Sequence, residues 1–191
     1  MTGKAVIISG PSGAGKTTIV KYLLSISKLK LAFSISACTR PIRDGEVNGR
    51  DYHFITVDQF KNRIDEGAFI EWEEVYKNSY YGTLKSEVEC IWKSNYHALF
   101  DVDVMGGVNL KNKFGDNALA VFIMPPSIDV LKLRLKKRGT ESEERIRNRI
   151  NKATLELKFT RKFDVTLLNN NLAEVQKEAE QLVSAFLINT T

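Results

Sequence analysis

The hydrophobic pattern at the start of the chain predicts a buried strand followed by a helix. Residues 4–9 are a short apolar run rich in β-branched side chains, which is typical of a strand inside a parallel sheet. This run stops at a glycine cluster, and from Lys16 apolar side chains return at helical spacing through Leu24. The order strand, glycine loop, helix is half of a β-α-β unit.

The next segment, residues 33–83, predicts an inserted subdomain, because it is rich in strands and has one helix, unlike the regions on either side. Its 40–49 stretch is dense in charge, proline and glycine and is expected to be a loop. Thr56 and Gln59 have capping-box spacing, and the helix that they open is expected to end at Gly67. Strands are predicted at 31–37, 69–76 and 79–82.

Alternating helices and strands return after this insert and predict a parallel sheet with crossover helices. The strands are expected at 97–103, 118–124 and 164–168. The helices are expected at 84–93, at 107–113, from 129 onward and from 172 onward. Within the charged stretch 134–144, Thr140 and Glu143 form a second capping-box pair, which starts a long basic helix through Arg161. The fold class is therefore α/β.

Composition limits the classes of protein to which the chain can belong. Its 191 residues, 43% of them hydrophobic, fit one compact domain, and they exclude disordered, collagen-like and repeat proteins. Cys38 and Cys90 are the only cysteines and support neither a disulfide framework nor a zinc site, which fits a reducing cytoplasm. Apolar runs such as 118–124 are far shorter than the roughly 18 residues that a membrane helix needs. The net charge is +5, but the basic residues are spread along the chain with acidic residues between them. Such a surface suits phosphorylated small molecules as well as nucleic acid.

The strongest chemical signal is a complete GxxxxGK[ST] motif between the first predicted strand and helix. The motif consists of Gly10, Pro11, Ser12, Gly13, Ala14, Gly15, Lys16 and Thr17. Its glycines permit a tight turn whose N–H groups face a phosphate at a helix N-terminus. Lys16 is expected to contact the β and γ phosphates, and the Thr17 hydroxyl to ligate magnesium. The alternative is a glycine-rich turn that matches by chance, and the flanking elements argue against it.

A second cluster lies in the predicted 40–49 loop and just after it. Arg40 and Arg43 precede Tyr52, and guanidinium groups grip phosphate oxygens in pairs while a phenol donates to another oxygen. Taken alone, such a loop is more often solvated surface. Its position after a phosphate-binding motif favours the binding interpretation.

Together these motifs resemble the guanylate kinase family along essentially the whole chain. Besides the P-loop, the resemblance rests on residues 36–40 (SACTR), 43–46 (RDGE), 49–52 (GRDY), 69–72 (FIEW), 80–83 (YYGT), 101–103 (DVD) and 138–141 (RGTE). P-loops occur in many NTPases, whereas the pattern TRxxRxGExxGxDYxF at 39–54 is far more specific.

The resemblance implies an architecture and an activity. The expected fold is a P-loop NTPase-type parallel sheet core flanked by helices, with an inserted mixed α+β GMP-binding subdomain and a helical lid. The core would comprise residues 1–32, 84–137 and 162–191, the GMP-binding subdomain 33–83 and the lid 138–161. The activity would be Mg²⁺-dependent transfer of the γ-phosphoryl group of ATP to GMP, and to dGMP, within cytoplasmic purine metabolism. The sequence itself is compatible with a monomer or a homodimer, and its charge distribution and short apolar runs predict neither a nucleic-acid nor a membrane partner.

The resemblance also implies which residues bind GMP. Its phosphate would be held by Arg40, Arg43, Tyr52 and Tyr81, and its guanine by Ser36, Glu71, Thr83 and Asp103. The chemistry agrees, because guanine presents N1–H and N2–H₂ donors that pair with carboxylates, while adenine lacks matching donors. The alternatives are that Glu71 is an exposed acid beside Trp72 and that Asp103 is a helix N-cap.

The donor side is assigned in the same way. The resemblance implies that the P-loop, Arg134, Arg138 and Asn169 bind ATP and that Lys16, Arg43, Arg138 and Arg149 are catalytic. Arginines delivered by lid closure would stabilise the charge on the transferring phosphoryl group. Thr17 and Asp101 would hold Mg²⁺, directly or through water, although Asp101 and Asp103 could exchange roles. Arg145 and Arg147 are expected to be helix surface.

Three other interpretations compete with a GMP kinase. Guanylate-kinase-like interaction modules typically have a degraded P-loop, whereas this one is complete. A P-loop kinase for another phosphorylated acceptor would not need Glu71, Asp103 and Thr83. Nucleic-acid binding would rest on net charge alone.

The chain departs from the family pattern at two places. Met105 stands where the family usually has glutamine, and Asn170 and Asn171 stand where it often has aspartates. Neither change touches an expected phosphate contact, so altered affinity or packing is expected and the chemistry is retained. His53 and His97 lack metal-ligand spacing and are expected to be structural. Both cysteines are expected to be buried packing residues.

Overall fold

The computed structural model describes residues 3–137 and 143–188. Its core is a five-stranded sheet in the order β2-β7-β1-β8-β9, and every neighbouring pair in it is parallel. The strands are β1 (Ala5–Ser9), β2 (Leu31–Phe33), β7 (His97–Asp101), β8 (Ala118–Met124) and β9 (Val165–Leu168). β1 is buried along its whole length, as its unbroken apolar sequence predicted.

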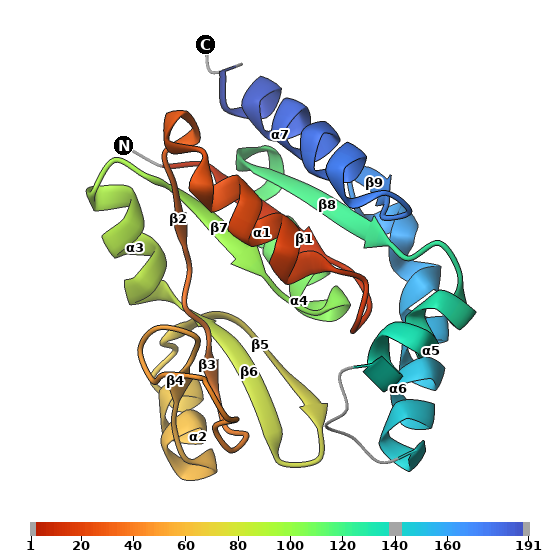
Figure 1. Cartoon of the computed structure of the whole chain (residues 1–191). Coiled ribbons are helices and arrows are strands. Elements are labelled where there is room, and N and C mark those ends of the chain that lie inside the picture. The colour runs from red at the N-terminus through yellow and green to blue at the C-terminus, as the bar shows by residue number, and fades with distance from the viewer. Residues whose placement is uncertain (1–2, 138–142, 189–191) are drawn as a thin grey trace.

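Helices cover both faces of this sheet (Figure 1). On one face, α1 (Lys16–Ser25) and α7 (Leu172–Ile188) bury Ile19, Leu23 and Val183 against alternate residues of the strands. On the other face lie α3 (Lys85–Lys93), α4 (Val104–Phe114) and the 3₁₀ helix η3 (Leu157–Lys162). The remaining short 3₁₀ helices are η1 (Ser27–Leu29) and η2 (Gly115–Asn117). The predicted α/β core is confirmed.

The insert forms a second, mixed sheet in the order β4-β3-β6-β5. Its strands are β3 (Ala37–Cys38), β4 (His53–Phe54), β5 (Phe69–Tyr76) and β6 (Ser79–Leu84). Helix α2 (Val57–Asp65) packs on it through Phe60, whose ring stacks on that of Phe69 at 4.4 Å. The Thr56–Gln59 capping box is formed by both of its hydrogen bonds.

One predicted strand is wrong. Residues 31–37 do not form a single strand, because β2 pairs with β7 in the core and β3 pairs with β4 and β6 in the insert. The chain passes between the sheets at Ser34, whose N–H donates to the Leu99 carbonyl. The alternation of apolar residues is continuous across this point, so the pattern alone could not reveal the break.

Most of the described residues between β8 and β9 are helical. They include α5 (Ile128–Lys137) and α6 (Glu143–Glu156), and these two helices share a small apolar cluster that includes Leu131 and Ile146. The helix predicted through Arg161 ends as an α-helix at Glu156 and continues as η3. Thr140, the cap predicted for α6, lies outside the described residues.

Two further predictions have clear outcomes. The histidines have structural partners: His53 pairs with Glu87 at 3.5 Å, and His97 Nδ1 accepts from the Lys4 amide. The prediction for the cysteines is correct for Cys38, which is buried, and wrong for Cys90, which is exposed. Cys90 lies on α3 away from the buried side of that helix, which is formed by Val88 and Ile91.

Candidate active site

A cavity of about 690 Å³ lies between the core, the insert and α6. The P-loop, the β3–β4 loop, β5, β6, the residues after β7 and the inner side of α6 all contribute to its wall. The sequence-predicted residues that line it are Gly10, Ser12, Gly13, Gly15, Lys16, Thr17, Ser36, Arg40, Arg43, Tyr52, Glu71, Tyr81, Asp101, Asp103 and Arg149. Residues predicted to bind two different substrates therefore share one space.

The P-loop has the backbone that its glycines were expected to allow. Gly10 and Gly15 have φ values of +144° and +98°, and Gly15 stands at the N-terminal end of α1. A Cβ on Gly10 would lie 2.5 Å from the Ile123 carbonyl oxygen, and one on Gly15 would lie 2.3 Å from Asn169 Nδ2. Only glycine fits both the conformation and the space at these positions.

The reactive side chains of the P-loop are held by short contacts. The Lys16 ammonium donates to the Gly10 carbonyl at 2.7 Å, within the loop whose phosphate it was predicted to contact. The Thr17 hydroxyl donates to Asp101 Oδ2 at 2.7 Å, which joins the start of α1 to the end of β7. Because β1 and β7 are parallel neighbours, their C-terminal ends lie at the same edge of the sheet. This brings Thr17, at the start of α1 just after the P-loop turn, close to Asp101 at the end of β7.

In the β3–β4 loop, Arg40 is the best-anchored cation. Its guanidinium makes two bonds to the Glu46 carboxylate, at 2.7 and 2.6 Å, and lies 4.9 Å from the centre of the Tyr52 ring. Glu46 also accepts from the Arg43 amide at 2.9 Å. These donors hold the pKa of Glu46 below its ordinary value. The Tyr52 ring meets that of Tyr81 edge-on at 5.9 Å, and all four predicted phosphate ligands line the cavity.

At another part of the wall, two carboxylates converge. A Cβ on Gly106 would lie 3.2 Å from both Asp103 Oδ1 and Glu71 Oε2. Glu71 is 9% exposed, and the Thr83 hydroxyl donates to its Oε1 at 2.6 Å. Burial raises the pKa of Glu71 to about 7, with the Asp103 charge adding to the effect and the Thr83 bond opposing it. Glu71 is therefore a buried acid that titrates near neutrality.

Asp103 has two roles in the structure. Its Oδ1 accepts from the Gly106 amide at 2.9 Å and caps α4, so the N-cap alternative describes a real contact. Its Oδ2 accepts from the Lys152 ammonium at 3.2 Å, and both residues line the cavity. This cap also explains why α4 starts at Val104, three residues before the predicted start.

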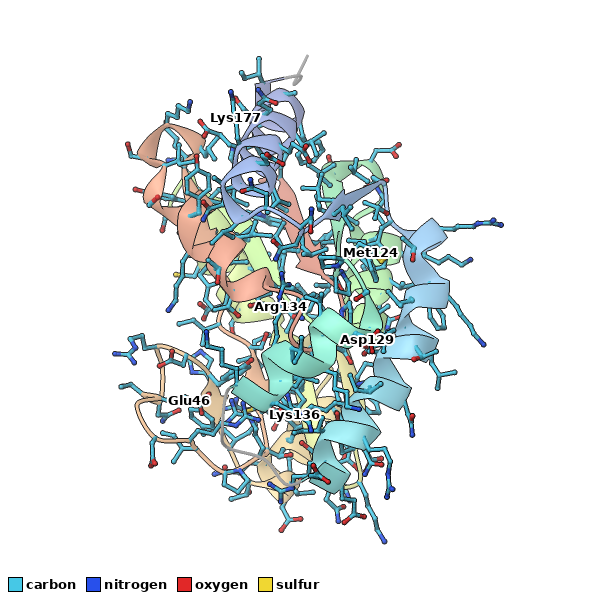
Figure 2. The ribbon with its side chains drawn as sticks, turned by 45° about the vertical axis from the view of Figure 1, so that its right-hand side comes forward. Glu46, Met124, Asp129, Arg134, Lys136 and Lys177 are labelled. Carbon is cyan, nitrogen blue, oxygen red and sulfur yellow. The ribbon has the colours of Figure 1, made fainter. Side chains whose placement is uncertain are left out.

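Some predicted site residues support the wall from behind and do not line it. Thr83 is fully buried and reaches the cavity only through Glu71. Asn169 is 4% exposed and donates from Nδ2 to the Ala14 carbonyl at 2.7 Å. Arg134 donates to the same carbonyl at 3.4 Å and to the Asn169 carbonyl at 3.0 Å. Figure 2 shows Arg134 where α5 approaches the N-terminal end of α1.

The predicted lid arginines have different outcomes. Arg149 on α6 donates to the Ser12 hydroxyl at 2.7 Å and thereby contacts the P-loop. Arg138 lies outside the described residues. Arg145 and Arg147 are exposed, as expected of helix surface.

Comparison with known proteins settles the family. The family model described as guanylate kinase matches residues 2–186. A guanylate kinase from Porphyromonas gingivalis is 46% identical, with 96% of this chain and 98% of that protein aligned. One from Bacteroides fragilis is 47% identical, with 96% of this chain and 90% of that protein aligned. The chain belongs to the guanylate kinase family.

A solved structure agrees. The crystal structure of guanylate kinase from Anaplasma phagocytophilum has a TM-score of 0.81 at 25% identity, covering 99% of this chain and 88% of that one. A shikimate kinase from Acinetobacter baumannii, at 14% identity and a TM-score of 0.50, shares the fold alone. As a guanylate kinase family member, the chain is a nucleoside monophosphate kinase, a phosphotransferase for which the family implies ATP and GMP as substrates.

Among the cavity residues that sequence reasoning missed in this guanylate kinase family member, Glu46, Lys152 and Glu156 make ion pairs. Glu46 holds Arg40, and Lys152 and Glu156 pair with each other at 3.5 Å on the inner side of α6. Glu46 was visible inside the diagnostic motif, but only the fold shows which arginine it grips. Lys152 follows Arg149 by three residues, which places both on one helix face, and this spacing was an available signal.

The family departures lie off the cavity wall. Met105 sits in the first turn of α4 and is 36% exposed, and it does not line the cavity. Asn171 Oδ1 accepts from the Ala173 amide at the start of α7.

Among residues 3–137 and 143–188, no helix is long and apolar enough to cross a membrane. In the same residues, no group of three or more His, Cys, Asp or Glu side chains is arranged to hold a metal.

Proposed function

We propose that the chain catalyses Mg²⁺-dependent transfer of the γ-phosphoryl group of ATP to GMP, and also to dGMP, giving ADP and GDP or dGDP. The observation that carries the proposal is that one cavity joins the P-loop, the Arg40 and Arg43 cations and the convergent carboxylates of Glu71 and Asp103. We place this activity in cytoplasmic purine metabolism, in a protein that acts as a monomer or homodimer.

The acceptor site is assigned from its donors and acceptors. Glu71 and Asp103 accept from guanine N1–H and N2–H₂, and the Ser36 hydroxyl donates to O6 or N7. Thr83 acts through Glu71, because its hydroxyl donates its hydrogen bond to that carboxylate. The GMP phosphate is held by Arg40, Arg43, Tyr52 and Tyr81. None of these contacts uses the ribose 2′-hydroxyl, which supports dGMP as a second acceptor.

The donor site is built on the P-loop. Backbone N–H groups of residues 10–17 cradle the ATP phosphates at the N-terminus of α1, and Lys16 exchanges its Gly10 contact for the β and γ phosphates. Arg149 contacts the loop from α6, and Arg138 is assigned to the same lid on the family pattern. Arg134 and Asn169 fix the Ala14 end of the loop and belong to the adenine side of the site.

The residues present fit a magnesium ion. The Thr17 hydroxyl and an Asp101 carboxylate oxygen stand 2.7 Å apart beside Lys16, and both are the hard oxygen donors that Mg²⁺ prefers. Two protein oxygens suffice, since this ion usually keeps waters and substrate phosphate oxygens as its other ligands. When bound, Mg²⁺ supplies neutralisation of the phosphate charge.

In the proposed reaction, a phosphate oxygen of GMP attacks the γ-phosphorus of ATP in line. The new O–P bond forms as the bond from the γ-phosphorus to the β–γ bridging oxygen breaks, and ADP leaves. Lys16, Arg43, Arg138 and Arg149 balance the charge on the equatorial oxygens, and positioning supplies much of the rate. A phosphate monoester is already ionised near pH 7, so no side chain is needed as a general base.

An ADP-release assay with ATP, Mg²⁺ and each of GMP, dGMP, AMP, CMP and UMP tests the proposal. Turnover with GMP and dGMP alone supports it. Turnover with another base would keep the P-loop assignment and reject the guanine site. Binding of GMP without turnover, by folded protein, would favour an interaction module, and omission of Mg²⁺ tests the metal requirement.

A further inference from the structure

One face of α6 reaches both halves of the cavity. Arg149 and Lys152 are three residues apart, so their side chains project from the same side of the helix. Arg149 contacts Ser12 in the P-loop, and Lys152 contacts Asp103, which caps α4 just after β7. A single helix face therefore touches the phosphate-binding loop and one of the two carboxylates assigned to guanine.

Lys152 is more firmly placed than a surface lysine. Its ammonium lies 3.2 Å from Asp103 Oδ2, 3.5 Å from Glu156 Oε1 and 5.3 Å from the centre of the Tyr76 ring. These partners belong to the core, to α6 itself and to the end of β5 in the insert. The Glu156 side chain is only 10% exposed, so it holds the ammonium from the inner side of the helix. Figure 1 shows α6 on the side of the molecule toward which the β5–β6 hairpin extends.

The Asp103 carboxylate is held at both oxygens. The Gly106 amide occupies one acceptor position on Oδ1, and Lys152 occupies one on Oδ2. Each carboxylate oxygen offers about two acceptor positions, so one on each oxygen remains for a ligand. Without Lys152 the group would be fixed at Oδ1 alone and would rotate about the Cβ–Cγ bond.

Two convergent carboxylates are suited to one particular base. Hypoxanthine presents only N1–H at the relevant edge, whereas guanine presents N1–H and the 2-amino group. One well-placed carboxylate suffices for the first pattern, and the second requires both Glu71 and Asp103. Discrimination for the 2-amino group therefore depends on how well the second carboxylate is oriented.

We propose that Lys152 is a positioning and specificity-determining residue that orients Asp103 toward the purine edge, so that the lid helix takes part in selecting guanine. This inference rests on the proposed function, in which Asp103 reads guanine. Because Arg149 lies on the same helix face, α6 contacts both the donor phosphate loop and the carboxylate assigned to the acceptor base.

The test compares Lys152→Met with Lys152→Arg in the full-length enzyme, measuring kcat and KM for GMP and for IMP, which lacks the 2-amino group. Lys152→Met is expected to raise KM for GMP about tenfold, to leave kcat within about twofold, and to lower the preference for GMP over IMP by about the same tenfold factor. Lys152→Arg is expected to restore most of that preference, since the guanidinium can still donate to Asp103. Lys158→Met removes an exposed charge from η3 and is expected to change neither quantity.

The outcomes separate this inference from the function on which it rests. Asp103→Asn keeps a helix-capping side chain and loses the charge, and it is expected to lower the GMP preference over IMP. If Asp103→Asn lowers that preference and Lys152→Met does not, or raises KM for both nucleotides equally, the role of Lys152 is overturned. If Asp103→Asn leaves the preference unchanged, Asp103 does not recognise the 2-amino group. That result would reject both this part of the proposed function and the role of Lys152. The double variant is expected to be no worse than Asp103→Asn, and additive losses would contradict action through Asp103.

Discussion

The Thr83 hydroxyl donates a 2.6 Å hydrogen bond to Glu71 Oε1, across the β5–β6 pair of the insert. The bond stabilises the ionised form of a carboxyl group whose pKa burial raises to about 7. Thr83 therefore influences the fraction of Glu71 that is ionised, and able to accept hydrogen bonds from guanine, at neutral pH.

Thr83→Val should weaken GMP binding by removing that donor while keeping the shape of the side chain. The pKa of Glu71 is expected to rise further, so the fraction of ionised Glu71 at pH 7 falls and KM for GMP increases by about tenfold. Steady-state kinetics at pH 7 and pH 8.5 checks this, with a partial recovery expected at the higher pH. Thr39→Val, which removes a hydroxyl just after β3 that bonds to Asn78 and Tyr80 and not to Glu71, serves as the control. An unchanged KM would show that Thr83 does not act through Glu71.

GMP affinity of the wild type should fall as pH drops below about 7, because protonated Glu71 carries a donor where guanine also presents donors. The GMP phosphate titrates near pH 6 as well, so Glu71→Gln is measured alongside to isolate its share. The pH dependence of binding that disappears in Glu71→Gln belongs to the carboxyl group. Equal pH profiles in the two proteins would contradict the assignment.

Glu71→Gln should also change stability in a pH-dependent way. The folded-state pKa of Glu71, about 7, lies above that of the unfolded chain, so its contribution to stability is fully present below the unfolded pKa and is lost as pH rises through 7. The variant is therefore expected to melt higher than the wild type at pH 8, by about 2–4 °C for each kcal/mol relieved, and not at pH 4. Thermal melts at the two pH values check this. If Glu71→Gln has a lower Tm than the wild type at pH 8, the ionised Glu71 carboxylate stabilises the folded state, which would contradict the prediction.

Lys16→Met should abolish turnover, with a loss of at least about 10³-fold, because no other P-loop cation replaces its charge on the β and γ phosphates. The side chain donates to the Gly10 and Pro11 carbonyls within its own loop and is not part of the hydrophobic core, so the far-UV CD spectrum is expected to stay that of the wild type. Lys177→Met, which removes an exposed positive charge from α7 away from the cavity, is the control. A folded Lys16 variant with undiminished activity would refute the role assigned to this lysine.

Gly10→Ala should destabilise the fold by about 2 kcal/mol or more, because the new Cβ would lie 2.5 Å from the Ile123 carbonyl at a φ of +144°. Gly45→Ala is the matched control: it has φ of +82° and no heavy atom within 4 Å of the added Cβ, so it is expected to cost only about 1 kcal/mol. Urea denaturation of both variants measures the difference. Equal losses would indicate that the P-loop relaxes around the added carbon.

Local sequence determined most of the elements of this protein. The buried apolar run of β1 and the glycines at 10, 13 and 15 specify a strand and a phosphate-binding turn, because side-chain type and backbone conformation are coupled within a few residues. The Thr56–Gln59 capping box formed as its spacing predicted. The prediction at 31–37 failed for the opposite reason, since the alternation does not say with which sheet each half pairs.

Tertiary structure decided the electrostatics and the partners in the site. The raised pKa of Glu71 comes from burial, and the pairing of Lys152 with Asp103 joins residues 49 positions apart. Arg134 and Asn169, which motif position assigned to ATP, both donate to the Ala14 carbonyl of the P-loop, a contact that the motif did not predict. Motif spacing identifies which side chains are chemically suited to a site. Desolvation and long-range hydrogen bonds act through space, so only the folded chain decides their charge state and their partners.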